Sequence, residues 1–321
     1  MERAFLLGAL LSIAYPGQAC DQCGCGLLQG VQPHDRANNF GLQWRMRYLH
    51  GNITEPVAIT SLAKHGGHGV STSSTTTKVS DYTEVYQALE LRGQFWLGQR
   101  FSVMGAIPLV NNYQSVDNVR HADVYEVGDP MLLGRYALLS SHCGPDTAAV
   151  RYRLTVGAGA KLPLGRHDVT QYGETLDHDL QPGTGTWDGL LSLEFMLSGA
   201  RWGTSLSTVG RYNGVNDDGH RMGHALSGTA EVFRSFTFGT VKWYPSAGGY
   251  VEAALPDRHD GERMTGTGGT TLFTHVGTRV WWHAFGISFT WQHALLQDQG
   301  ELMIPNRERI VAGIIYNLNN N

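Results

Sequence analysis

Apolar and polar residues alternate through most of this sequence of 321 residues, and this period of two limits what the chain can form. Between residues 40 and 48, the letters FGLQWRMRY put an aromatic or aliphatic side chain at every second position. The same period recurs in residues 150–158, 285–291 and 310–318. A period of two is typical of a β-strand with one apolar and one polar face. Outside the N-terminal residues no stretch of helical length has a period of 3.6, so the sequence predicts an all-β protein.

The pattern predicts about twelve strands joined by connections of alternating length. Connections at 98–99, 200–201 and 283 are expected to be short, and those at 51–81, 110–127 and 163–185 long. Short periplasmic turns opposite longer extracellular loops are typical of outer-membrane barrels. An even number of strands also returns both termini to the periplasmic side. The predicted strands are 39–50, 82–97, 100–109, 128–138, 148–162, 186–199, 202–214, 222–234, 238–253, 267–282, 284–298 and 307–319.

We therefore predict a closed antiparallel transmembrane β-barrel whose apolar side chains face lipid and whose polar side chains face the lumen. Closure is required because unpaired backbone groups are not tolerated in hydrocarbon. Composition agrees, since 16% of residues are charged and no apolar run is long enough for a membrane-spanning helix. A formal net charge of −4 gives no basis for a nucleic-acid partner. A soluble β-protein with an aromatic core is the alternative architecture.

The N-terminus has the features of an export signal. Arg3 precedes the apolar run AFLLGALLSIA, and small residues follow it. We expect residues 1–19 to be a signal peptide, 20–38 a cysteine-rich periplasmic segment and 39–321 the barrel domain. The expected location is the outer membrane.

Several short motifs follow one another in a fixed order along the chain. They are CDQCGCG at 20–26, GDP at 128–130 leading to GRY at 134–136, KLPLG at 161–165, LQPGTG at 180–185 with WD at 187–188, and TGG at 267–269. Their order resembles the outer-membrane channel-like family named for the meta-pathway of phenol degradation, and related transporter barrels of Bacteroidetes-type bacteria. The resemblance covers essentially the whole mature chain and implies a twelve-stranded barrel that passes small molecules. It supplies no binding residues, and the GDP and QPGTG motifs taken alone are typical of turns and strand starts.

A cysteine cluster is the strongest local signal for chemistry. Cys20, Cys23 and Cys25 have a spacing at which thiolates can bind a soft metal such as Zn²⁺ or Cu(I). Cys143 and the adjacent His142 lie in a connection that strand parity places on the same periplasmic side. Two alternatives stay open: disulfides Cys20–Cys23 and Cys25–Cys143, which export favours, and lipid attachment at Cys20.

The predicted lumen face carries more basic than acidic residues. Such an excess favours anions in a pore, although the same charges can instead pair across strands and fill a narrow barrel. The basic positions are Arg45, Arg47, Arg92, Arg135, Arg151, Arg153, Lys161, Arg211, Lys242 and Arg279, and the acidic ones are Glu84, Glu90, Glu194 and Glu231.

These features favour a channel or transporter for small solutes, with selectivity set by a net-basic lumen and the long external loops. The expected partners are outer-membrane lipid and a small anionic or aromatic solute. The alternative is a non-conducting metal-binding or interaction protein that uses the cysteine cluster on the same barrel. No enzyme is expected, because the sequence has no G-x-S-x-G, H-E-x-x-H, P-loop or dinucleotide-binding motif.

Overall fold

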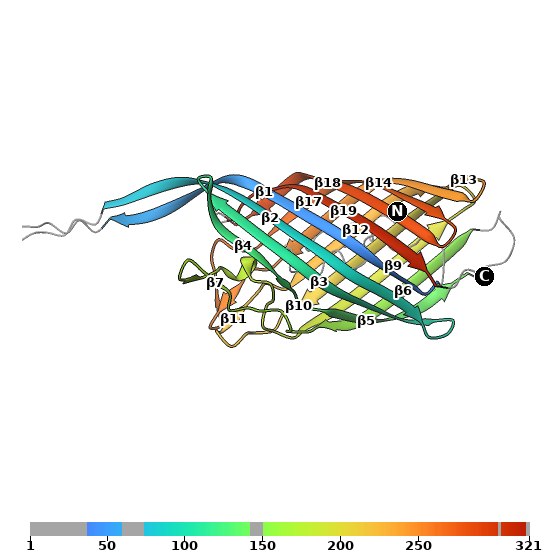
Figure 1. The fold of residues 1–321 in the computed structure, drawn as a ribbon, viewed down its shortest axis with the longest axis horizontal. Helices are drawn as coiled ribbons and strands as arrows, with labels where there is room; N and C mark the ends of the chain where they lie inside the picture. The colour runs from blue at the N-terminus through green and yellow to red at the C-terminus, as the bar shows by residue number, and fades with distance from the viewer. Residues whose placement is uncertain (1–36, 60–73, 142–149, 301–302, 319–321) are drawn as a thin grey trace, which may run out of the picture.

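The computed structural model describes residues 37–59, 74–141, 150–300 and 303–318. It shows a closed antiparallel barrel of twelve strands (Figure 1). β1 pairs with both β2 and β19, and β12 pairs with β14, so the sheet has no free edge along the barrel. Among the described residues, no helix has the length and apolarity needed to cross a bilayer. The predicted fold class is confirmed.

All twelve predicted strands are present, most of them with ends within a few residues of the predicted ones. The barrel strands are β1 (Asn39–Ile59), β2 (Ser74–Trp96), β3 (Phe101–Val116), β5 (Met131–Ser140), β6 (Arg151–Lys161), β9 (Asp188–Ser198), β10 (Trp202–Tyr212), β12 (Ala225–Arg234), β14 (Val241–Ala254), β17 (Gly269–Trp282), β18 (Phe285–Gln299) and β19 (Asn306–Asn317).

Two of the predicted long loops are partly strand. β1 and β2 continue as a paired arm as far as Ile59 and Ser74, and most of the predicted loop 110–127 is a hairpin of β3 with β4 (Val119–Val127). Many residues in these stretches are polar, so the sequence does not show the strand pattern clearly there, and the extensions lie beyond the apolar part of the outer face. β1 to β4 thus form one tall wall at the loop end of the barrel (Figure 1).

β4 and β5 behave as one strand interrupted at Gly128-Asp129-Pro130. Both pair with β3: Leu109 lies opposite Val127, and Ala106 opposite Met131. Between these two pairs the broken strand has one residue more than β3, which is the count of a β-bulge. The proline lacks an N–H for the ladder, so the sheet tolerates it at this interruption.

The remaining short elements lie in the loops or at the turn end. They are β7 (Thr170–Gln171), β8 (Glu174–Thr175) and the 3₁₀ turn η2 (His178–Leu180) between β6 and β9, β11 (His220–Arg221), β13 (Phe236–Phe238), β15 (Arg258–His259) and β16 (Glu262–Arg263). β11, β15 and β16 form a small sheet that joins two loops at the loop end of the barrel, which we call the mouth.

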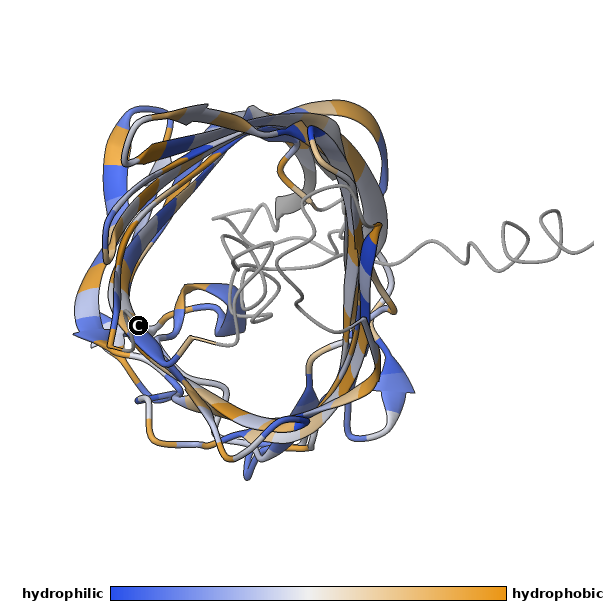
Figure 2. Ribbon diagram, turned by 90° about the vertical axis from the view of Figure 1, so that its right-hand side faces the viewer, coloured by the Kyte–Doolittle hydropathy of each residue, from blue (hydrophilic) through white to orange (hydrophobic). Residues whose placement is uncertain are grey.

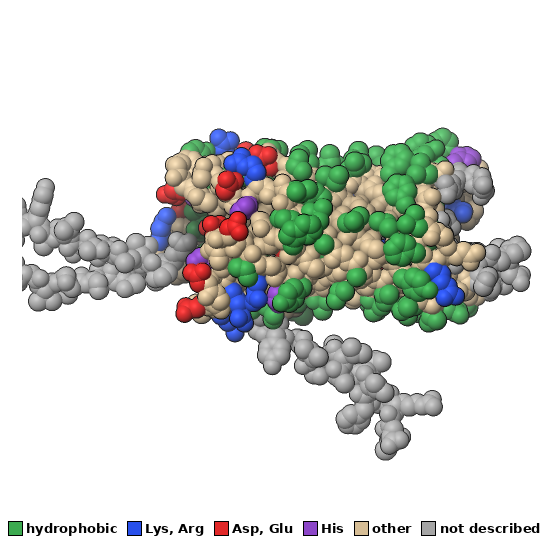
Figure 3. All heavy atoms as spheres, turned by 90° about the horizontal axis from the view of Figure 1, so that it is seen from below, with side chains coloured by type: hydrophobic (Ala, Val, Ile, Leu, Met, Phe, Trp, Pro, Cys, Tyr) green, Lys and Arg blue, Asp and Glu red, His purple; other side chains and the backbone are tan. Residues whose placement is uncertain are grey.

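Hydrophilic and hydrophobic residues alternate along the strands of the closed ring (Figure 2), and their exposures show that the outer face is apolar and the inner face polar. Leu42, Leu132 and Phe289 are about half exposed on the outside, whereas Arg47 and Arg153 are buried. Hydrophobic side chains form bands around the barrel, and charged side chains gather at the loop end (Figure 3). β6, β9 and β10 each have 11 residues, a length that spans a bilayer when the strand is tilted.

Candidate solute path in the barrel lumen

Several buried carboxylates in the lumen lie between two basic side chains. Glu90 of β2 lies 2.7 Å from the Nε of Arg45 and 2.5 Å from the Nη2 of Arg92. Glu194 of β9 lies 2.8 Å from Arg135 and 3.3 Å from Arg153. Burying a charge is costly unless it is paired, so the alternation of the strands places opposite charges within reach of one another.

Two further buried carboxylates also contact side chains from more than one strand. Glu252 of β14 pairs with Arg309 and lies 3.4 Å from Arg47, which comes from β1. Glu231 of β12 pairs with Arg279 of β17 and accepts from Ser205. These bridges tie the lumen faces of non-adjacent strands together, because β1 and β14 are separated in the sheet by β17, β18 and β19.

A separate cluster lies where the lumen meets the loop end. Lys161, the last residue of β6, donates to Asp129 at 2.9 Å and to Asp188 at 2.8 Å. The Nζ of Lys161 also donates to Thr184 at 2.6 Å, and Arg211 lies 3.9 Å from Asp188. We call Asp129, Lys161, Thr184 and Asp188 the anchor cluster. It brings together the GDP, KLPLG, QPGTG and WD motifs, which are far apart in the sequence.

The loop between β6 and β9, residues 162–187, lies against the inner face of the tall wall; we call it the inserted loop. Leu176 and Leu180 of this loop pack against Leu49 and Ile53 of β1 in one buried apolar cluster. The amide of Asn112 on β3 donates to two backbone carbonyls of the loop, at 3.0 and 3.2 Å.

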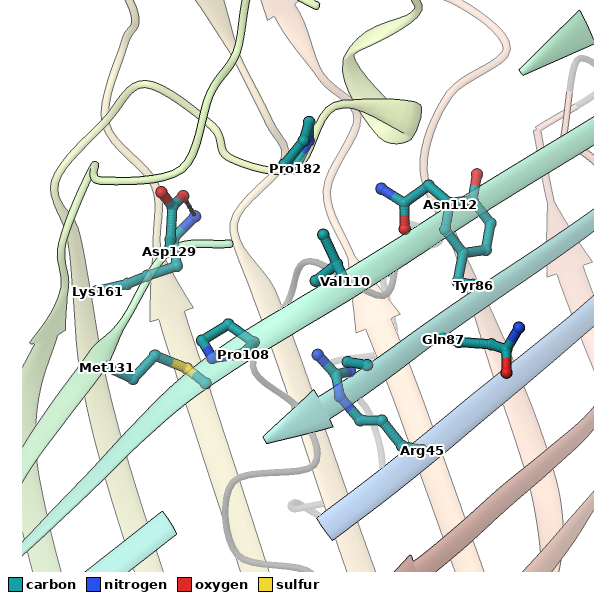
Figure 4. A pocket seen from close by; sticks show the side chains of 11 residues that line it. Arg45, Tyr86, Gln87, Pro108, Val110, Asn112, Asp129, Met131, Lys161 and Pro182 are labelled. Carbon is teal, nitrogen blue, oxygen red and sulfur yellow. Dashed lines mark hydrogen bonds and ion pairs between the residues drawn. The ribbon is translucent and has the colours of Figure 1, made fainter. Parts of the chain in front are cut away.

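A small pocket of about 30 Å³ lies below the inserted loop. Pro182 lies above it, and Arg45, Asn112 and Lys161 border it together with the apolar Met131 (Figure 4). A volume of this size has room for a water molecule rather than for a solute. The pocket therefore marks the space between the loop and the lumen wall.

Histidines from three loops, one of them the inserted loop, meet at the loop end of the barrel. The rings of His178 and His220 are stacked with their centroids 3.6 Å apart, and His259 lies 6.5 Å from His220. Burial, the largest cause, and the two other histidines lower the pKa of His220 from 6.5 to about 4. Burial likewise lowers the pKa of His178. Both rings are therefore neutral at pH 7.

Most of the sequence-predicted lumen residues lie in the buried, paired set. Arg151 is only half-buried at the start of β6, and Lys242 is exposed near the turn end of β14. The buried or nearly buried predicted residues are Arg45, Arg47, Glu84, Glu90, Arg92, Arg135, Arg153, Lys161, Glu194, Arg211, Glu231 and Arg279. The predicted metal or disulfide residues, Cys20, Cys23, Cys25, His142 and Cys143, lie outside the described residues. Within the described ranges no three or more His, Cys, Asp or Glu side chains are arranged so that they could hold a metal ion.

Sequence reasoning missed four buried charges, namely Asp129, Asp188, Glu252 and Arg309. Strand parity could have found them all. On a strand, residues separated by an even number of positions share a face, and adjacent residues lie on opposite faces. Each of the four charges either shares a face with a predicted lumen residue, as Asp188 does six positions before Glu194, or lies directly beside a residue predicted to face lipid. Both aspartates fall inside predicted strands, 128–138 and 186–199, and were noted only as members of the GDP and WD motifs.

Comparison with solved structures supports the fold. An outer membrane channel from Pseudomonas putida F1 superposes with a TM-score of 0.57, covering 89% of this chain and 99% of its own, at 14% sequence identity. CdiB from Acinetobacter baumannii has a TM-score of 0.33 at 9% identity, covering 90% of this chain and 61% of its own. The CymD monoaromatic hydrocarbon channel has a TM-score of 0.34 at 8% identity, covering 93% and 94%. The last two values are too low to indicate a shared fold.

No family model matches the sequence, and no curated protein is similar to it in sequence. The comparisons therefore support the barrel fold that the motif resemblance implied, and they add no sequence evidence for the family. This chain has the barrel architecture of an outer-membrane channel.

Proposed function

We propose that this protein is an outer-membrane channel for small solutes and that the solute path runs through the charged lumen. One observation carries the proposal: the barrel is closed, its outer face is apolar, and its buried inner face carries ion pairs. A soluble barrel would bury the apolar face instead, because water favours polar groups on the outside. A polar interior within an apolar belt suits passage of polar molecules across a bilayer.

The described lumen charges favour a weak preference for anions. Nine basic and seven acidic side chains are buried or nearly so in the barrel. Most of this charge is internally paired, so the net excess is small and the expected preference is modest. The basic set is Arg45, Arg47, Arg92, Arg135, Arg153, Lys161, Arg211, Arg279 and Arg309; the acidic set is Glu84, Glu90, Asp129, Asp188, Glu194, Glu231 and Glu252.

Current through a planar lipid bilayer tests this function. We expect discrete current steps after insertion of the purified protein, and a reversal potential in a salt gradient that shifts modestly towards the anion value. A barrel that inserts stably and resists heat in detergent, yet carries no current, would contradict the proposal. A preference for cations would be consistent with channel function but would contradict the proposal that the excess of basic side chains in the lumen sets the selectivity.

A further inference from the structure

We propose that the inserted loop, residues 162–187, forms the constriction of the channel and that Asp129 is the positioning residue that holds the loop there. This inference rests on the proposed channel function. Asp129 lies at the bulge between β4 and β5, on the inner side of the wall, and is buried, with 6% of its surface exposed.

Asp129 holds both limbs of the loop with one carboxylate. Its Oδ1 accepts the backbone N–H of Gly165 at 2.8 Å, and its Oδ2 accepts the backbone N–H of Thr184 at 2.9 Å. The Nζ of Lys161 lies 2.9 Å from the same Oδ2. Hydrogen bonds to a charged acceptor are about twice as strong as neutral ones. The bulge therefore places a charged acceptor where the chain enters the loop and where it leaves it.

The two limbs also approach each other too closely for larger side chains. A Cβ on Gly183 would lie 2.4 Å from the carbonyl oxygen of Gly165, and the N–H of Gly183 donates to the carbonyl of Arg166 at 2.8 Å. The loop is thus closed at its base by a backbone hydrogen bond, with glycine required on at least one limb.

Beyond this base, hydrogen bonds and apolar packing hold the inserted loop inside the mouth of the barrel. Gln181 is buried, and its side-chain amide donates to the carbonyls of Val169 and Leu176 while its oxygen accepts the N–H of Val169. This amide satisfies backbone groups that would otherwise be buried without partners. Leu180 then packs against the lumen-facing Leu49 in the apolar cluster of the wall. Withdrawing the loop would expose that cluster to water, so burial favours the inserted position.

The consequence for a solute follows from the position of the loop. Pro182 lines the same pocket as Arg45, Met131 and Lys161 and lies above them in the view of Figure 4. A solute that enters from the loop end must pass beside this segment before it reaches the paired charges below. The loop therefore sets the size limit of the path, and Asp129 sets the position of the loop.

Two variants of the full-length protein test the inference. Asp129→Asn removes the charge but keeps the side-chain shape. Deletion of residues 167–182 removes the inserted part, and its flanks Arg166 and Gly183 are already joined by a hydrogen bond. Asp117→Asn is the matched control, because the carboxylate of Asp117 likewise accepts a backbone N–H, that of Asp81 at 2.9 Å, and lies 3.3 Å from a lysine, Lys78, but these partners lie outside the inserted loop. Resistance to unfolding in detergent confirms that each barrel is folded.

The first readout is trypsin cleavage after Arg166, and the second is single-channel conductance. For Asp129→Asn we expect cleavage to accelerate by about tenfold, the effect of losing one charge-assisted hydrogen bond. Conductance should rise in Asp129→Asn and rise further, severalfold, in the deletion variant. Asp117→Asn should match the wild type in both measurements.

The outcomes separate the parts of the inference. Unchanged cleavage in Asp129→Asn would overturn its role as the anchor of the loop. Conductance equal to the wild type in the deletion variant would overturn the constriction. If neither the wild type nor any variant conducts, the channel function fails and the constriction fails with it, while the cleavage rates still decide whether Asp129 holds the loop.

Discussion

At the scale of single residues, the lumen depends on carboxylates shared between two cations. Glu194 is buried between Arg135 and Arg153, at 2.8 and 3.3 Å. Removing a shared carboxylate leaves two guanidinium groups near each other without their counter-charge. Such a loss costs more than the loss of a pair at the surface, where water screens the charges.

Glu194→Gln should therefore destabilise the barrel by about 3 kcal/mol, the usual cost of an uncompensated buried charge. Urea unfolding in lipid vesicles, followed by tryptophan fluorescence, measures the change. Glu174→Gln, on the exposed β8, is the matched control and should leave stability unchanged. The double variant Glu194→Gln with Arg153→Gln should recover part of the loss; no recovery would show that the arginine is not the source of the cost.

At the scale of elements, the mouth is assembled from loops that contact one another through histidines. His220 on β11 stacks on His178 of the inserted loop, and His259 of β15 lies nearby. The acidic groups around His220 are Asp218 in its own loop and Asp257, 3.9 Å away in the loop between β14 and β17. Burial and the other histidines outweigh these carboxylates and keep the ring neutral.

Acid should loosen this contact. The pKa of His220 is lowered to about 4 in the assembled mouth, so the ring gains a proton more readily when the loops separate. The stabilisation is complete above pH 6.5 and is lost as the pH falls towards 4. Amide hydrogen exchange in residues 213–224, corrected for the intrinsic pH dependence, should accelerate over this range.

His220→Gln should weaken this acid response, because the substituted side chain does not titrate. His121→Gln, an exposed histidine on β4, should leave it unchanged. Equal acceleration in the wild type and in His220→Gln would assign the response to other groups.

At the scale of the whole molecule, the barrel is a sheet closed on itself inside an apolar belt. Residues on the middle of the short strands, such as Leu193 on β9, face outward and are 40% exposed. Val215 is also exposed, at 61%, but it lies in the loop between β10 and β12. Both positions are exposed, but their surroundings differ if the belt is embedded in lipid.

Leu193→Arg should therefore lower stability by about 2–4 kcal/mol in lipid vesicles, the cost of a cation near the bilayer midplane on a barrel strand. Val215→Arg should have little effect, because its side chain remains in water. Urea unfolding of the inserted protein measures both. Equal effects for the two variants would contradict the placement of the belt in the membrane.

The alternation of residues by itself determined the strands, the two faces and the side of the barrel on which most charges lie. This is because a period of two is a local property that any stretch such as 40–48 carries alone. Local pattern also predicted the inward position of Arg47 and Glu194 before any neighbour was known.

Only the tertiary structure decided what those charges meet. Lys161 ends β6, Asp188 begins β9, and Asp129 lies at the bulge between β4 and β5. Because β5, β6 and β9 are neighbours in the sheet, the contact depends on their pairing register and on one extra residue at the bulge. The inserted loop depends likewise on the apolar cluster that the tall wall offers it. Turn-forming residues such as those at 180–185 specify that the chain bends. Which surface the bent segment packs against is decided only when the sheet closes and brings that surface to it.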